Sequence, residues 1–329
     1  HGGAMATDDN AARRGARARE PGMIQTRGPR SPRSFYRCSN GTGVRVESTT
    51  SGFGPATSVR VGELTFDVAT AGPQTGTPVL LLHGFPETSA CWRPMAPTLT
   101  AAGLRLYAPD QRGYSPGARP EGVDAYRVEH LVADVIGLLD ALGIARAHLV
   151  GHDWGAIVGW FAAAWHPDRV QTLTAVSVPH PAAFGWAVAH DADQQQRSAY
   201  IKAFRRPGTE DKLLADDCRR LRATFGGDVD LPLVEEHLHR LSEPGALSAA
   251  LSWYRAMTAE FAALDPVTVP TTYVWSDGDA YLGRAGALRC RRFVSGPYRF
   301  VELAGISHWI PEQAPHRLAD EVLHRVSTP

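Results

Sequence analysis

The chain has 329 residues, of which 43% are hydrophobic, and its formal net charge at pH 7 is zero. This length suffices for one large domain or for a domain with an inserted lobe, and the zero charge gives no global attraction to nucleic acid or anionic membranes. No apolar run approaches the roughly 18 residues that a membrane-spanning helix requires. We therefore expect neither nucleic-acid binding nor membrane insertion.

The cysteines are scattered without a C-x-x-C pair, at Cys38, Cys91, Cys218 and Cys290. This spacing favours free thiols in a cytoplasmic protein over a metal site or a disulfide framework. Residues 1–54 are rich in Arg, Gly, Ser and Pro and lack periodicity, and their opening H-G-G-A-M resembles an expression-tag remnant. For this segment we expect a solvated, disordered basic tail rather than a nucleic-acid-binding arm.

From residue 55 onwards, short apolar or alternating segments predict strands, and longer segments with helical spacing predict helices. Strands are expected at 59–61, 64–68, 78–82, 104–108, 147–150, 170–176, 271–275 and 299–303. Helices are expected at about 91–102, 126–142, 156–165 and 312–326. The alternation of the two indicates an α/β fold with a mostly parallel central sheet.

The alternation breaks at residues 179–258, which contain several helical patterns and no convincing strand. We expect a helical lid there, inserted between a first core part at 55–178 and a second at 259–329. Ligands of open α/β sheets bind outside the carboxyl ends of the strands. A lobe inserted after a strand end can therefore cover such a site.

The stretch Gly151-His152-Asp153-Trp154-Gly155 lies between an apolar strand and an apolar helix. Its two glycines permit a sharp strand-to-helix turn, which raises the central residue above the sheet at the positive end of the helix. The serine form of this pattern is the nucleophile elbow. Here the central residue is Asp153, so the turn predicts a carboxylate nucleophile.

Two further groups follow predicted strand ends. Asp277 and Asp279 follow the strand at 271–275, and His308 follows the strand at 299–303. Nucleophile, acid and histidine thus occur in the chain order of an α/β-hydrolase triad. A single Asp or His at such a place is usually structural, but the three together in this order predict a catalytic set.

A second sequence match, Gly113-Tyr114-Ser115-Pro116-Gly117, has the letters of a serine elbow. The residue after the nucleophile must donate its backbone N–H to the oxyanion hole, and Pro116 has no N–H. We therefore exclude Ser115 as the nucleophile. For Asp153 the expected oxyanion donors are the N–H of Trp154 and, from the turn after the strand at 78–82, that of Phe85.

A carboxylate that attacks a saturated carbon forms an ester whose carbonyl belongs to the enzyme, and histidine-activated water can then cleave that ester. Asp153 therefore predicts either epoxide opening or carbon–halogen cleavage. An epoxide leaves as an alkoxide and needs a proton or hydrogen bond, which a phenol can provide at neutral pH. The lid offers Tyr200 and Tyr254 for this role, although either is on composition more often a packed aromatic.

The chain resembles the epoxide hydrolase branch of the α/β-hydrolase family from about residue 57 to its end. The matching segments are His83-Gly84-Phe85-Pro86, Gly151–Gly155, Trp275-Ser276-Asp277-Gly278-Asp279, Gly305–Trp309, Tyr200…Pro207-Gly208 and Trp253-Tyr254-Arg255. The resemblance implies Asp153 as nucleophile, His308 as base, Asp279 rather than Asp277 as the orienting acid, and Tyr200 and Tyr254 as ring-opening acids. It also implies a cis peptide at Phe85-Pro86, although Ser276 stands where the family usually has Gly.

The resemblance implies a small-molecule epoxide as substrate and no cofactor or metal. The nearest alternative is a haloalkane dehalogenase, but those enzymes usually have Asn or Glu in place of Phe85 and lack the paired tyrosines. Fluoroacetate dehalogenases usually have Arg in place of Trp154. A non-catalytic ligand receptor on a hydrolase scaffold is the alternative from another class. The sequence leaves the oligomeric state open, with a homodimer among the options.

Overall fold

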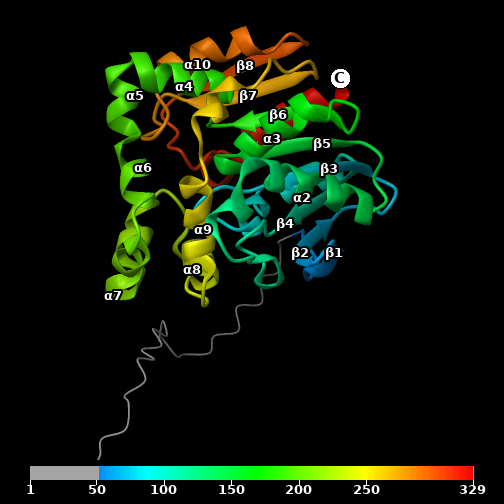
Figure 1. Ribbon diagram of the computed structural model, residues 1–329. Coiled ribbons are helices and arrows are strands. Elements are labelled where there is room, and N and C mark those ends of the chain that lie inside the picture. The colour runs from blue at the N-terminus through cyan, green and yellow to red at the C-terminus, as the bar shows by residue number, and fades with distance from the viewer. Residues whose placement is uncertain (1–51, 329) are drawn as a thin grey trace, which may run out of the picture. The chain divides into compact units, whose positions relative to one another are not determined.

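The computed structural model of the chain describes residues 52–328. Within that range, eight strands form one sheet in the order β1-β2-β4-β3-β5-β6-β7-β8 (Figure 1). Only the β1–β2 and β2–β4 pairs are antiparallel. The strands are β1 (Thr57–Val61), β2 (Leu64–Ala71), β3 (Thr77–Leu82), β4 (Leu104–Pro109), β5 (Ala147–His152), β6 (Val170–Val176), β7 (Thr271–Ser276) and β8 (Tyr298–Leu303). The prediction of an α/β fold with a mostly parallel sheet is confirmed.

Helices cover both faces of the sheet. The α-helices are α1 (Ala96–Ala101), α2 (Val128–Ala141), α3 (Trp154–Trp165), α4 (Pro181–His190), α5 (Ala192–Arg197), α6 (Ala199–Phe204), α7 (Thr209–Thr224), α8 (Leu231–Leu241), α9 (Ala246–Arg255), α10 (Arg284–Arg289), α11 (Ile310–Gln313) and α12 (Pro315–Ser327). The 3-10 helices are η1 (Ser89–Trp92), η2 (Pro116–Ala118), η3 (Val123–Tyr126), η4 (Ala259–Ala263) and η5 (Cys290–Phe293).

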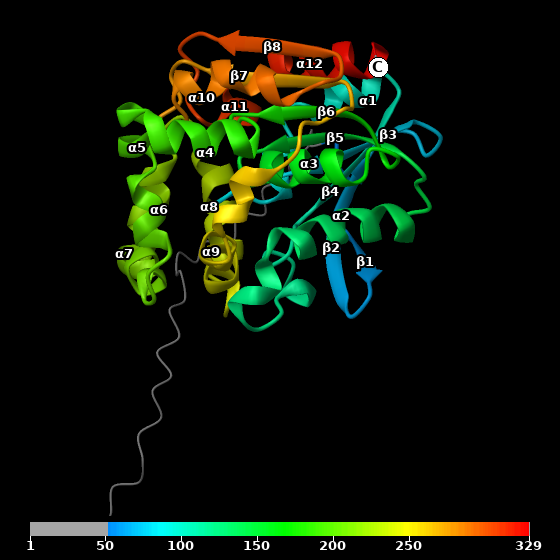
Figure 2. The same cartoon turned by 45° about the horizontal axis from the view of Figure 1, so that its top comes forward.

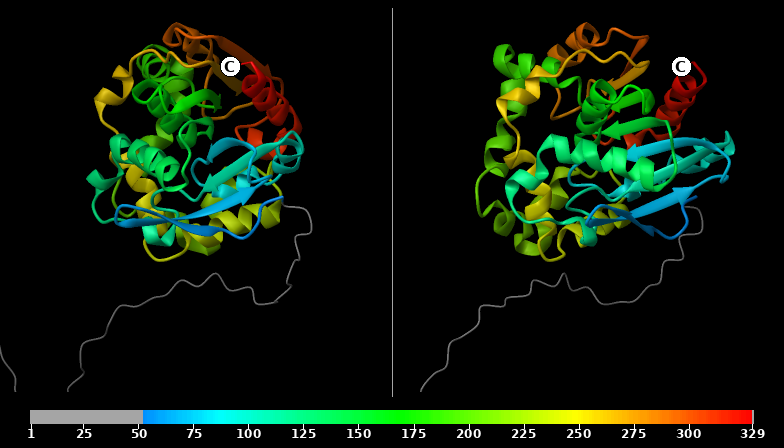
Figure 3. Two further views of the ribbon diagram at one scale, coloured as in Figure 1. Left: turned by 90° about the vertical axis from the view of Figure 1, so that its right-hand side faces the viewer. Right: turned by 45° about the vertical axis from the view of Figure 1, so that its right-hand side comes forward.

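The central strand β3 shows why the sheet is buried on both faces. Successive side chains of a strand point to opposite faces, and in β3 four successive residues from Val79 to Leu82 are fully buried. Leu80 and Leu82 pack in the cluster that contains α2 and α3, whereas Val79 and Leu81 pack in the cluster with α1 and α12. In the left view of Figure 3, α12 (red) lies on the opposite side of the strands from α2 and α3 (green).

Two helices predicted as continuous are interrupted at prolines. The helix expected at 91–102 is divided into η1 and α1, with Pro94 between them and Pro97 in the first turn of α1. The helix expected at 312–326 is divided into α11 and α12, and Pro315 begins α12. A proline lacks the N–H that an interior helical position must donate and clashes with the preceding turn. The helical spacing continues across these points, but the hydrogen bonding does not.

Between β6 and β7 the described chain contains α4 to α9 and η4 and no strand of the sheet. We call the segment 181–263 the lid. Figure 2 shows these helices on the side of the sheet toward which the arrow of β8 points, which is the carboxyl end of the parallel strands. The lid contacts the core through η1, η3, α10 and η5. It therefore lies over the ends of the strands that precede the candidate catalytic residues.

Several sequence predictions concern residues outside the described range. Residues 1–51, which include Cys38 and most of the expected tail, lie outside it. The thiols of Cys91, Cys218 and Cys290 are free and buried. Among the described helices none is both long and apolar enough to cross a membrane.

Candidate active site

The turn between β5 and α3 holds Asp153 in a strained backbone conformation, with φ of 51° and ψ of −117°. A side chain at Gly151 would place its Cβ 2.2 Å from the carbonyl oxygen of Gly155, and one at Gly155 would lie 1.9 Å from the carbonyl oxygen of Leu82. Only glycine fits at either position. The two glycines therefore let the turn close tightly and raise Asp153 at the amino end of α3.

The turn after β3 wraps around the same carboxylate. The backbone N–H of Phe85 donates to Oδ1 of Asp153 at 2.9 Å, and the Phe85-Pro86 peptide is cis. A Cβ at Gly84 would lie 2.4 Å from the Cβ of Asp153, so the close approach of this turn also requires glycine. The backbone N–H of Phe85 thus points at the carboxylate of Asp153.

His308 lies between two carboxylates. Its Nε2 is 3.5 Å from Oδ2 of Asp153, and its Nδ1 is 2.8 Å from Oδ2 of Asp279. The other oxygen of Asp279 accepts the backbone N–H groups of Tyr281 and Leu282, at 2.7 and 3.0 Å. Asp277 is exposed and accepts from the N–H of Gly305 instead. The structure thus brings Asp153, His308 and Asp279 together and leaves Asp277 outside.

Ser276, at the position where the family usually has glycine, has a structural role. Its hydroxyl donates to the backbone carbonyl of Ile306 and accepts from the N–H of Gly278 at 3.3 Å. These bonds connect the loop that carries Asp279 with the loop that carries His308. Serine in place of the usual glycine therefore adds two hydrogen bonds that support these loops.

Two tyrosines of the lid share a cavity with Asp153. Tyr200 lies on α6 and Tyr254 on α9, and their ring centroids are 6.3 Å apart. Both line a cavity of about 200 Å³, which we call the outer cavity. Its lining consists of Phe85, Pro86, Asp153, Tyr200, Phe204, Leu213, Thr224, Tyr254, Tyr281, His308 and Trp309. Asp153, His308, Tyr200 and Tyr254 are the candidate reacting groups in this lining. The other lining residues are apolar except for Thr224 and Tyr281.

Comparison with known proteins decides the family. A family model for the alpha/beta hydrolase fold matches residues 77–315. The chain is 34% identical to epoxide hydrolase A of Mycobacterium tuberculosis over 297 residues, which covers 78% of this chain and 92% of the relative. It is 36% identical to AB hydrolase superfamily protein YfhM of Bacillus subtilis over 266 residues, again covering 78% of this chain and 92% of the relative. The crystal structure of epoxide hydrolase A from Mycobacterium thermoresistibile matches with a TM-score of 0.73 at 29% identity, covering 84% of this chain and 99% of that one.

The chain belongs to the epoxide hydrolase branch of the α/β-hydrolase family. A second solved structure, a Bacillus megaterium epoxide hydrolase in complex with an inhibitor, matches with a TM-score of 0.76 at 25% identity, covering 83% of this chain and all of that chain. The resemblance drawn from the sequence motifs is confirmed, and the protein is a hydrolase. The roles of individual residues depend on the geometry and charges of this chain.

In this hydrolase the charges around Asp153 and His308 determine the protonation of both side chains. Although burial raises the pKa of the Asp153 carboxyl, His308, His152 and the N–H of Phe85 outweigh it, and the pKa lies below its usual range. Although burial lowers the pKa of His308, the carboxylates of Asp279 and Asp153 raise it to about 10. Before any reaction Asp153 is therefore ionised, and His308 carries the complementary positive charge.

The two lid tyrosines of this hydrolase remain protonated. Burial, followed by the charge of Asp153 among the other causes, raises the pKa of both Tyr200 and Tyr254 well above the usual value. The side chain of Tyr254 partly offsets this rise for Tyr200, and the side chain of Trp154 partly offsets it for Tyr254, without reversing either. The indole of Trp154 can only donate, so it leaves the proton of Tyr254 available. Trp154 thus lies beside Tyr254, with the two ring centroids 5.1 Å apart.

Three residues of the site were missed in the sequence. His152, just before Asp153, is fully buried, with Nδ1 2.8 Å from Oε2 of Glu87 and Nε2 2.9 Å from the backbone carbonyl of His308. Glu312 lies close enough to Glu87 for each carboxyl group to shift the pKa of the other. In the sequence, one local feature indicates this contact. It is Glu87 itself, a glutamate that directly follows the H-G-F-P turn in a stretch whose other residues are buried.

These buried groups connect the turns that carry Glu87, His152 and His308. A carbonyl can only accept, so Nε2 of His152 must carry a proton toward His308. Although burial raises the pKa of Glu87, the charge and hydrogen bond of His152 lower it, whereas burial and the nearby Glu87 raise the pKa of Glu312 well above its usual range. Glu312 is accordingly the protonated partner, because two adjacent buried carboxylates cannot both be ionised.

The excluded nucleophile Ser115 is part of the fold. It is fully buried; its hydroxyl donates to the carbonyl of Asp110 at 2.5 Å and accepts from the N–H of Asp67 at 2.8 Å. The hydroxyl thus both donates and accepts a hydrogen bond within the core. The pattern that resembles a serine elbow therefore connects β2 to the loop after β4.

Proposed function

We propose that this enzyme hydrolyses epoxides to vicinal diols in two steps, with an ester on Asp153 as the intermediate. The observation that carries the proposal is that two protonated phenols, Tyr200 and Tyr254, line the same outer cavity as an ionised carboxylate at the elbow, Asp153. This arrangement provides a nucleophile for carbon and hydrogen-bond donors for the leaving oxygen. Relatives named as epoxide hydrolases support it.

In the first step the epoxide oxygen accepts hydrogen bonds from Tyr200 and Tyr254. An oxygen of Asp153 attacks a ring carbon, the carbon–oxygen bond of the ring breaks, and its electrons go to the alkoxide, which takes a proton at the tyrosines. The other Asp153 oxygen, Oδ1, stays on the N–H of Phe85. The product of this step is an alkyl ester of Asp153 with a neighbouring hydroxyl group.

Ester formation removes the negative charge of Asp153. That charge is one of the causes that raise the pKa of His308, so the pKa falls and His308 becomes a better base. His308 then gives up the proton that it carried, and this proton passes through water to the tyrosine that lost its own. The neutral imidazole, oriented by Asp279, takes a proton from a second water molecule, and the hydroxide formed attacks the ester carbonyl. Phe85 donates to the oxyanion. On collapse the substrate oxygen takes the proton from His308 and leaves with the diol, and the acid formed on Asp153 returns its proton to His308, which restores the Asp153 carboxylate. Protein side chains and water perform every transfer.

Carbon–halogen cleavage by the same nucleophile is the alternative. A halide leaves as an anion and needs no proton, so phenols that donate to a leaving oxygen favour the epoxide. The test is to give the enzyme styrene oxide and 1-chloro-2-phenylethane, which share a carbon skeleton, and to measure diol and chloride. We expect diol from the first compound and no chloride from the second above the level of an Asp153→Ala control.

Chloride release without diol formation would contradict the proposal in favour of a dehalogenase. Binding of styrene oxide without any product would instead favour a non-catalytic receptor. Because both compounds carry the same phenylethyl group, a difference between them reports the leaving group rather than the fit to the cavity.

A further inference from the structure

Asp153 also lines a second, smaller cavity. A smaller cavity of about 30 Å³, which we call the inner cavity, lies next to the outer cavity, and Asp153, Tyr200, Tyr254 and Tyr281 line both. The remaining lining of the inner cavity is apolar apart from the Trp154 N–H and comprises Trp154, Ile157, Val178, Phe184, Ile201, Met257 and Leu282. The reacting groups therefore stand where two apolar spaces meet.

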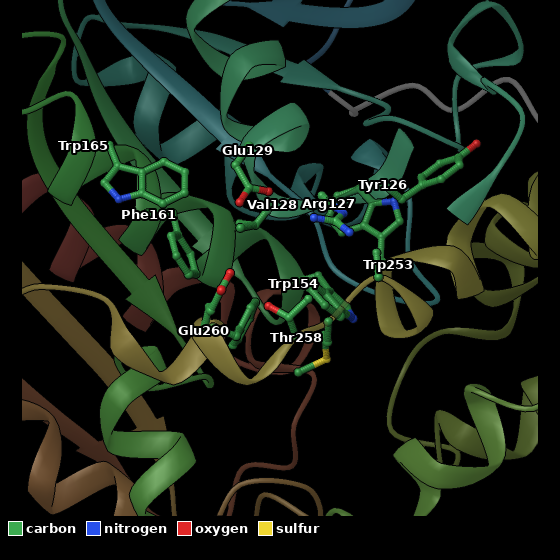
Figure 4. Close-up of a pocket in the computed structure, with 13 residues that line it drawn as sticks. Tyr126, Arg127, Val128, Glu129, Trp154, Phe161, Trp165, Trp253, Thr258 and Glu260 are labelled. Carbon is green, nitrogen blue, oxygen red and sulfur yellow. The ribbon is translucent and has the colours of Figure 1, made fainter. Parts of the chain in front are cut away.

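A third cavity, of about 160 Å³, lies beyond the inner one and shares Trp154 and Met257 with it. Figure 4 shows Trp154 among the residues of this third cavity, with Phe161 and Trp165 on one side of it and Trp253 on the other. The exposed side chains of Arg127, Glu129 and Glu260 stand at its rim. The third cavity is thus largely aromatic inside and reaches the protein surface.

Trp154 and Met257, which line both the inner and the third cavity, differ in how tightly their side chains are packed. The ring of Trp154 makes edge contacts with Trp253, Tyr254 and Phe261 at centroid distances of 5.5, 5.1 and 6.0 Å. Met257 follows the end of α9, is half-buried, and ends in a flexible thioether. Met257 is therefore the part of the wall that a substitution can remove without disturbing the aromatic packing.

Displacement at a ring carbon requires the attacking oxygen and the leaving oxygen to lie on opposite sides of that carbon. In a substrate held between Asp153 and the tyrosines in this way, substituents on the two ring carbons extend sideways, into the two cavities that share these residues. A volume of about 30 Å³ holds only two or three water-sized groups. The inner side thus accepts a short substituent, and the outer side a larger one.

Building on the proposed function, we propose that the enzyme takes uncharged 1,2-disubstituted epoxides with a large apolar group in the outer cavity and a group of about one or two carbons in the inner cavity. Met257 sets that inner limit, because it separates the inner cavity from the third cavity. The absence of charged side chains other than the reacting groups from both linings selects an uncharged substrate.

The test is a series of trans-1-phenyl-1,2-epoxyalkanes whose alkyl end lengthens from methyl to hexyl, with kcat/KM of each variant normalised to its own value for the methyl compound. For the wild type we expect a drop of at least about tenfold beyond the ethyl compound. In Met257→Ala the inner and third cavities join, and each added methylene that becomes buried should raise kcat/KM by about fourfold. Met257→Leu conserves the volume and should keep the wild-type limit.

A second variant works in the opposite direction. Met257→Phe is expected to fill the inner cavity and to shift the limit from ethyl to methyl. Equal length profiles for Met257→Ala and the wild type, or a wild type that accepts hexyl as well as methyl, would overturn the inference while the epoxide activity stands. Diol from no member of the series would contradict the proposed function itself.

Discussion

Replacing His308 with Gln is expected to stop the enzyme after its first step. Asp153 still attacks the epoxide, but no base remains to activate water for attack on the ester. Turnover should fall by a factor on the order of 10⁴ to 10⁶, as for other enzymes whose catalytic base is removed. The effect is large because the imidazole ring of His308 also connects the two carboxylates. Its Nε2 is 3.5 Å from Asp153, and its Nδ1 is 2.8 Å from Asp279.

The measurement is the intact mass of His308→Gln after incubation with styrene oxide, which should rise by the mass of one substrate molecule. Peptide mapping should place the added mass on Asp153. His148→Gln is the matched control, because His148 is a buried histidine on β5 whose ring contacts Thr172 and not the site. Diol formation by His308→Gln at a tenth of the wild-type rate, without an adduct, would show that histidine is not the base for ester hydrolysis.

Removing both phenols is expected to suppress ring opening. Each preorganised donor to a developing oxyanion contributes on the order of 10² to 10³ in rate, so Tyr200→Phe/Tyr254→Phe should lose at least about 10³-fold in single-turnover ester formation, and each single variant less. The substitution removes only hydroxyl groups, so the rings keep their contacts with Phe204, at 5.2 Å from both.

Tyr281→Phe provides the comparison. Tyr281 lines the same cavity, but its hydroxyl donates to the backbone carbonyl of Thr224 at 3.3 Å, so its loss should cost less than about tenfold. Rapid-quench kinetics with styrene oxide and thermal unfolding of each variant separate chemistry from folding. A double variant that forms the ester at the wild-type rate would show that other groups donate to the epoxide oxygen.

The local features of the site follow from short sequence signals. The elbow at Asp153 is predictable because glycines at 151 and 155 are a steric requirement of the turn itself. The strand ends before Asp279 and His308 are predictable because apolar runs end there. Strand β6 falls at the predicted residues, Val170–Val176. Family, fold class and the parallel arrangement of the sheet could therefore be derived before any coordinates.

Features made by contacts between distant segments could not be derived. The bridge from Glu87 through His152 to the carbonyl of His308 joins three turns that are up to 221 positions apart along the chain, by their residue numbers. The inner cavity and the separating role of Met257 depend on how α6 and α9 pack over α3, which no periodicity encodes. The catalytic roles of Asp153, His308, Asp279 and the tyrosines stay predictions until the variants are measured.

The most direct test of the central claim follows the oxygen atoms through one turnover. Enzyme in excess over an epoxide reacts in water enriched in heavy oxygen, and the masses of the first diol and of the peptide containing Asp153 are measured. The ester route takes the diol's new oxygen from the Asp153 carboxylate, so we expect an unlabelled diol and label in Asp153. Label that enters the first diol directly, with none in Asp153, would show that water attacks the epoxide itself and would contradict the account.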